Sequence, residues 1–185
     1  MLEDLQTYLA ELSAYDLAAQ GVGFVAMGCA LSAFATTCDR RFYLVLIATH
    51  TLFCAHFLML GALAGAGANF IAIFRAWFAR GRRGLDTCLV LVLAYIAMAT
   101  LTVRAPVDLL AALAPIVGTP IMFLLAGWKM RVALLVCSSM WLTYNALSGS
   151  WGGVLNELTV MTINLITITR LLIEQRAIAP AKSTA

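Results

Sequence analysis

The chain has 185 residues, of which 63% are hydrophobic and 11% charged, and its mean hydropathy is +0.94. A water-soluble domain carries charge on about a quarter of its residues, so 12 Lys and Arg with 9 Asp and Glu are too few to cover such a surface. The composition therefore predicts a membrane protein and excludes secreted, disordered and nucleic-acid-binding proteins.

Uncharged intervals of about 20 residues mark the expected membrane helices. The interval 42–74 is too long for one helix, and we divide it at the cluster from Gly61 to Gly67, where a tight turn is expected. Acidic residues precede the first apolar interval, so it is expected to be a membrane span and not a cleaved signal peptide. The predicted helices cover 17–38, 42–62, 65–80, 86–104, 108–127, 131–148 and 152–174.

The positions of Lys and Arg predict the orientation, because cations in short loops stay on the cytoplasmic side. With the N-terminus outside and the C-terminus in the cytoplasm, all of them except Arg75 and Arg104 fall in or next to cytoplasmic loops. Adding or removing one helix would destroy this asymmetry. The fold class expected is thus an all-α polytopic protein with seven transmembrane helices.

Two parts of the chain share one pattern, which consists of a basic start, a polar residue near the outer end, a glycine-rich turn and an arginine. In this pattern His56 corresponds to Asn145, and Arg75 to Arg170. The repeat predicts two parallel three-helix bundles around one linker helix, as in many transporters. The expected divisions are an extracytoplasmic segment at 1–16, a bundle at 17–80, the linker helix at 86–104, a bundle at 108–174 and a cytoplasmic tail at 175–185.

Several stretches resemble the YgjV-type bacterial inner membrane proteins. They include AQGVG at 19–23, HFLMLG at 56–61, AGAGANFIAIFR at 64–75 and GGVLNELTVMTINLITITR at 152–170. The resemblance covers most of the chain, carries no catalytic signature, and implies a multi-pass protein of the bacterial inner membrane. The layout of three, one and three helices is also similar to that of SWEET and PQ-loop carriers, which move small solutes by alternating access, although the Pro-Gln dipeptide is absent here.

Glu157 and Arg75 are charged residues that lie well inside predicted helices, where each costs about 2.5–3.5 kcal/mol on insertion scales. Glu157 shares a helix face with Asn164, and we interpret it as a contact for a solute or proton; the alternative is a structural ion pair or a headgroup contact. Arg75 is expected to pair with a carboxylate or substrate, or else to extend to the headgroups.

The neutral candidates are amides, one histidine and one tryptophan. Asn69 in the third predicted helix and Asn156 or Asn164 in the seventh suit hydroxyl-rich solutes. The likeness to SWEET-type carriers implies Asn69 and Asn164 as the analogous substrate-binding pair. His56 and Asn145 are expected in the cavity or in interhelical packing, and Trp141 in a stacking wall or in packing. His50 is interpreted as a packing residue, and its spacing from His56 does not fit an i, i+4 metal pair.

The sequence thus predicts a small polar-solute transporter that works by alternating access between two bundles, with a sugar or sugar-acid-like metabolite as candidate substrate. The alternative is a non-transporting membrane receptor or accessory protein that holds a ligand or partner in the same cavity. No catalytic, cofactor or metal residues are expected, and so no enzyme. Membrane lipids and the solute are the expected partners, a homo-oligomer is open, and no nucleic acid is expected.

Overall fold

The computed structural model describes residues 13–34, 39–78 and 84–178, and the structural statements below refer to these residues. They form seven α-helices and no strand, which confirms the all-α fold class. The predicted segment 1–16, the basic loop at 79–83 and the tail at 175–185 lie wholly or partly outside the described residues. The helices are α2 (Ala14–Phe34), α3 (Asp39–Met59), α4 (Leu63–Phe78), α5 (Leu85–Thr102), α6 (Asp108–Leu124), α7 (Gly127–Leu147) and α8 (Trp151–Ile178).

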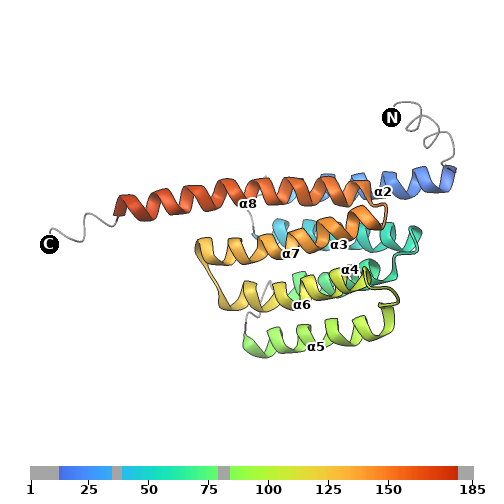
Figure 1. The fold of residues 1–185 in the computed structure, drawn as a ribbon, viewed down its shortest axis with the longest axis horizontal. Helices are drawn as coiled ribbons and strands as arrows, with labels where there is room; N and C mark the ends of the chain where they lie inside the picture. Colours follow the sequence, from blue (N-terminus) through green and yellow to red (C-terminus); the bar gives the residue numbers. More distant parts are fainter. Residues whose placement is uncertain (1–12, 35–38, 79–83, 179–185) are drawn as a thin grey trace.

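The observed helix ends lie within about one turn of the predicted ones, and the differences have local causes. At the start of α2, the Asp16 carboxylate accepts hydrogen bonds from the Ser13 backbone at 3.0 Å and from its hydroxyl at 2.6 Å, so the helix begins earlier than predicted. At the start of α7, Lys129 and Arg131 belong to the helix, because long cationic side chains can extend to the headgroups. At its other end α8 continues to Ile178, past the ends of the other helices (Figure 1).

Six helices form a closed ring, and the seventh lies outside it. In chain order α2 contacts α3, α3 contacts α4, α6 contacts α7, and α7 contacts α8. The ring is completed by contacts of α2 with α8 and of α4 with α6, while α5 packs on α4 and α6 (Figure 1). The order of contacts is the same in the two halves of the ring, as the predicted repeat requires. The repeat, the grouping into two bundles and the orientation of the termini stay predictions.

The loops between α3 and α4 and between α7 and α8 are tight turns at the same end of the ring, which we call the turn end (on the right in Figure 1). Each turn contains a glycine with positive φ, +70° at Gly61 and +71° at Gly149, a conformation that other residues rarely adopt. Of the predicted glycine cluster only Gly61 is in the turn. Gly65 lies within α4, where a Cβ would approach a Tyr144 ring carbon to 2.8 Å.

The outer surface of the ring suits a bilayer. Three helices are long and apolar enough to cross a membrane, over Ala14–Ala33, Arg41–Met59 and Leu85–Thr102, and α4 and α6 are shorter apolar helices. On α5, large apolar side chains face outward, with Leu89 64% and Leu93 63% exposed. In α7 and α8, by contrast, polar side chains face the inside of the ring, where they line the cavity described next.

Candidate functional site

A cavity of about 340 Å³ lies inside the ring, and all seven helices contribute to its wall. Its volume falls at the lower end of the range of about 300–1,000 Å³ found for small-molecule pockets. Polar side chains reach the wall from five of the helices. They are Thr49, His50, Asn69, Arg75, Tyr95, Ser138, Asn145, Asn156, Glu157 and Asn164.

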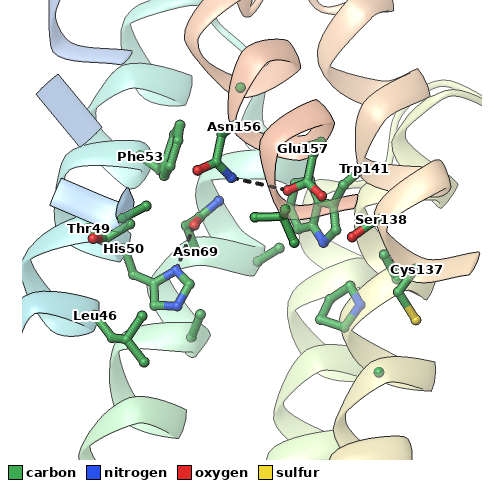
Figure 2. Close-up of a pocket in the computed structure, with 18 of the residues that line it drawn as sticks. Leu46, Thr49, His50, Phe53, Asn69, Cys137, Ser138, Trp141, Asn156 and Glu157 are labelled. Carbon is green, nitrogen blue, oxygen red and sulfur yellow. Dashed lines mark hydrogen bonds between the residues drawn. The ribbon is translucent and has the colours of Figure 1, made fainter. Parts of the chain in front are cut away.

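The Glu157 carboxylate lies among polar groups of α7 and α8 (Figure 2). Its Oε1 accepts a 3.3 Å hydrogen bond from Asn156 Nδ2, and Ser138 interacts with the same carboxylate. A carboxylate only accepts hydrogen bonds, so Asn156 Nδ2 faces Glu157. The Asn156 Oδ1 atom therefore points away from the carboxylate. That oxygen is buried and has no partner among the described residues. The region around Glu157 therefore offers acceptors to a solute.

On the opposite side of the cavity, His50 is oriented by a chain of hydrogen bonds (Figure 2). Asn69 Nδ2 donates to the Gly65 carbonyl at 2.9 Å, so Asn69 Oδ1 is the acceptor 3.0 Å from His50 Nδ1. His50 Nδ1 must then carry the proton, and in the neutral ring Nε2 is left as an acceptor. His50 and Asn69 thus form a fixed pair between α3 and α4.

Arg75 lies about 9 Å of helix rise beyond Asn69 in α4, because six residues separate them. Arg75 lines the cavity together with His50, Tyr95 and Cys137, which belong to three other helices. The charge therefore faces the cavity. Arg75 forms no hydrogen bond or ion pair with the residues that the structure describes.

The other amides of the cavity wall, Asn145 and Asn164, and the wall residue Trp141 differ in their contacts with the rest of the protein. Asn164 Oδ1 accepts a 2.9 Å hydrogen bond from Arg131 Nη1, whereas Asn145 Oδ1 is buried and lacks a partner among the described residues. Trp141 stacks on Phe57 with ring centroids 6.3 Å apart and 30° between the ring planes. The Trp141 ring therefore forms a fixed part of the cavity wall, which also includes Glu157 (Figure 2).

The structure places His56 outside the cavity wall, in agreement with the packing alternative and against the expected cavity role. The side chain is 0% exposed, with Nδ1 2.7 Å from the Ala19 carbonyl and Nε2 2.8 Å from Ser150 Oγ. Since a carbonyl only accepts, Nδ1 donates to Ala19, and Nε2 accepts from the Ser150 hydroxyl. The ring packs on Gly23, where a Cβ would be 2.8 Å from its Cε1.

Further hydrogen bonds tie the same region together. Gln20 Nε2 donates to the Gly149 carbonyl at 2.7 Å, and Gln20 Oε1 accepts from the Trp151 backbone at 3.2 Å. We call Gln20, His56 and Ser150, with their partners, the turn-end contact. It joins α2 and α3 to the start of α8.

Tyr144 of α7 makes a second link across the ring. Its hydroxyl accepts a 2.8 Å hydrogen bond from the Gly65 backbone N–H, one of the groups at the start of α4 that the helix leaves unpaired. The two halves of the ring are thus held at the turn end by polar contacts.

The structure brings most of the predicted binding residues to one cavity, although their role in binding stays a prediction. His50 and Ser138 are additional wall residues, and Asn156, the alternative to Asn164 in the sequence analysis, also lines the wall. The sequence contained a signal for the cavity position of His50. An amide at membrane depth, such as that of Asn69, needs a hydrogen-bond partner, and His50 lies in the adjoining helix. The predicted residues that line the cavity are Asn69, Arg75, Trp141, Asn145, Glu157 and Asn164.

The wall can hold a small solute through hydrogen bonds and through charge contacts of either sign. Within the described ranges, no three His, Cys, Asp or Glu side chains gather in a way that could hold a metal ion.

A family model described as a bacterial inner membrane protein, Imp-YgjV, matches residues 17–175. Inner membrane protein YgjV of Escherichia coli (strain K12) is 27% identical to the chain over 172 residues, which are 92% of this chain and 93% of that protein. No solved structure matches the chain.

Proposed function

The chain belongs to the YgjV family of bacterial inner membrane proteins, and from this premise we propose that it is a carrier for small polar solutes. It is a multi-pass protein of the inner membrane. The observation that carries the proposal is the cavity of about 340 Å³ inside the helix ring, because it combines charged and amide groups that a helix in lipid would otherwise not expose.

The ring suggests how such a carrier would work. The backbones of the group α2–α4 and of the group α6–α8 approach each other where α2 touches α8 and where α4 touches α6. Side chains of α7 also reach across the ring to α3 and α4. Rotation of one three-helix group against the other about these two seams would open the cavity to one side or the other, as in alternating access. In this proposal α5 is the linker helix, and the N-terminus is outside.

The wall residues take distinct roles in the proposal. Asn69, Asn145 and Asn164 form hydrogen bonds with the solute, and Trp141 packs against it. Glu157 and Arg75 interact with its charged or strongly polar groups. Membrane lipids are the other expected partners, and neither catalysis nor nucleic acid binding is part of the proposal.

Uptake into proteoliposomes tests the proposal. The purified protein should give saturable flux of at least one solute from a panel of sugars, sugar acids, amino acids and amines. Asn69→Ala should reduce that flux by about tenfold, which corresponds to the loss of roughly one hydrogen bond to the solute. Thr162→Ala is the matched control, because its hydroxyl is on the exposed side of α8 and bonds only to its own helix. Absence of saturable flux for every solute would contradict the carrier proposal.

The turn-end contact favours a second candidate, a receptor or accessory protein with a fixed cavity. Such a protein holds a ligand or partner without changing the side to which the cavity opens. It predicts ligand binding without flux, and a stable partner in a pull-down from mild detergent.

A further inference from the structure

The cavity holds one acidic and one basic side chain that do not neutralise each other. Glu157 is on α8 and Arg75 on α4, which belong to different halves of the ring. Glu157 interacts with Asn156 and Ser138, both neutral, and Arg75 has no hydrogen bond or ion pair within the described residues. The other nearby cation, Arg131, bonds to Asn164. An unpaired charge away from water is costly, so each of the two charges calls for a partner of opposite sign.

The neutral polar groups near Glu157 and near Arg75 also differ in the kind of solute group that they can bind. Close to Glu157, the unpartnered Asn156 Oδ1 is an acceptor, so this part of the cavity suits a donor such as an ammonium group. Trp141, three residues from Ser138 on α7, also lines the cavity and can add a cation–π contact. Arg75 and Tyr95 line the same cavity, and the buried Tyr95 hydroxyl lacks a partner among the described residues. That part of the cavity suits an acceptor such as a carboxylate.

We propose that the solute of this cavity is a zwitterion of the amino-acid class, with its ammonium group at Glu157 and its carboxylate at Arg75. The inference rests on the proposed function in that it assumes the cavity holds a solute. A sugar would leave both charges without a counter-charge. A simple amine would leave Arg75 unpaired, and a simple acid would leave Glu157 unpaired.

The spacing of the two charges fits a small molecule. Glu157 and Asn69 are each six residues into their helices from the turn end, and Arg75 lies about 9 Å of helix rise beyond Asn69. Both side chains line the same cavity and are long enough to extend along it toward each other. A solute with a few carbon atoms between its own charges can bridge what remains.

Thermal stabilisation of the full-length protein in detergent tests the proposal with probes that differ in one charge. The probes are the proteinogenic amino acids and γ-aminobutyrate, then butylamine and butyrate, which each lack one charge of γ-aminobutyrate, and glucose. At least one zwitterion should raise the melting temperature in a saturable manner. Its singly charged analogues should bind about 10- to 100-fold more weakly, because each lost charged hydrogen bond is worth about that factor. This comparison needs only the wild-type protein.

Charge variants then locate the groups. Glu157→Gln and Arg75→Gln should each weaken zwitterion binding by about 10- to 100-fold, whereas Arg75→Lys should recover part of the affinity. The matched controls are Glu174→Gln and Arg170→Gln, because both residues are exposed on α8 and are not part of the cavity wall. They should bind the zwitterion like the wild type.

The outcomes separate this inference from the proposed function. If sugars or single-charge solutes stabilise the protein and zwitterions do not, or if Glu157→Gln binds a zwitterion unchanged, the substrate class is wrong while carrier function can stand. If a zwitterion binds as expected but no flux appears in proteoliposomes, the carrier proposal fails and the site stands. If no probe binds and no flux appears, both fail.

Discussion

Replacement of Gly152 by alanine should push α2 and α8 apart at the turn end. A Cβ at this position would lie 2.5 Å from the Gly23 carbonyl carbon, 2.7 Å from its oxygen and 2.9 Å from the Phe24 nitrogen. All three are backbone atoms, so no side-chain rotation can relieve the overlap. Ordinary contact begins at 3.4 Å, and the helices must therefore separate by about 0.9 Å.

The expected cost follows from three effects, of which two are unfavourable and one is favourable. Overpacking of this kind typically destabilises by about 1–3 kcal/mol, and the separation also stretches the turn-end contact, whose hydrogen bonds contribute about 1 kcal/mol each. Alanine in place of a helical glycine returns up to about 1 kcal/mol. We expect a net loss of about 1–3 kcal/mol, which lowers the melting temperature of a chain of this size by about 2–4 °C per kcal/mol.

Thermal and denaturant unfolding in one detergent measure this effect, with Gly28→Ala as the matched control. Gly28 is also in a helix, but apart from the adjoining backbone of that helix no described atom lies within 4 Å of the position of its Cβ. The control should be neutral or up to about 1 kcal/mol more stable than the wild type. If Gly152→Ala is as stable as Gly28→Ala, the close approach of α2 and α8 is absent and the reasoning is refuted.

Three other substitutions test separate hydrogen bonds by the same unfolding measurements. Tyr144→Phe leaves a backbone N–H at the start of α4 unpaired and should destabilise the protein by about 1–3 kcal/mol. The control Tyr95→Phe removes a hydroxyl without a partner among the described residues and should not destabilise it. Equal losses for the two variants would contradict the hydrogen bond from Gly65 to Tyr144. Ser150→Ala removes the side chain that caps the start of α8 and should cost about 1–2 kcal/mol, whereas Ser139→Ala, on an exposed face, should be nearly neutral. Arg131→Gln should lower the free energy of unfolding by about 1–2 kcal/mol, because it removes the hydrogen bond from Arg131 to Asn164 in α8. An unchanged stability would show that this hydrogen bond does not stabilise the fold.

The helices could be predicted because a bilayer restricts sequence so strongly. Charge-free intervals fixed the number and order of the helices, since few other structures can bury so many apolar residues. The ends were less certain, because side chains at the ends decide them. Ser13 and Asp16 start α2 through a local capping pattern that is visible in the sequence. Lys129, in contrast, lies inside α7, so a charged residue need not mark the boundary of a helix.

The two histidines show where sequence reasoning about the site stops. Both are in α3, six residues apart, and therefore point in directions about 120° apart. Which of them faces the cavity depends on neighbours that are distant in sequence. His56 is held by Ala19 and Ser150, and His50 by Asn69. Only the packing of α2 and α8 against α3 assigns those partners.

The contacts between the halves of the ring are unevenly distributed, and this bears on the proposed transport cycle. Wall residues near the turn end are buried, with Phe57 2% and Asn145 3% exposed, and hydrogen bonds that join the two halves lie at this end. The described structure thus closes the cavity at the turn end. A small set of hydrogen bonds, each worth about 0.5–1.5 kcal/mol net, supports this closure. Their sum is comparable to the few kcal/mol that separate interconverting conformations of a protein. Contacts of this strength can hold a carrier in one state and still be released when a solute favours the other.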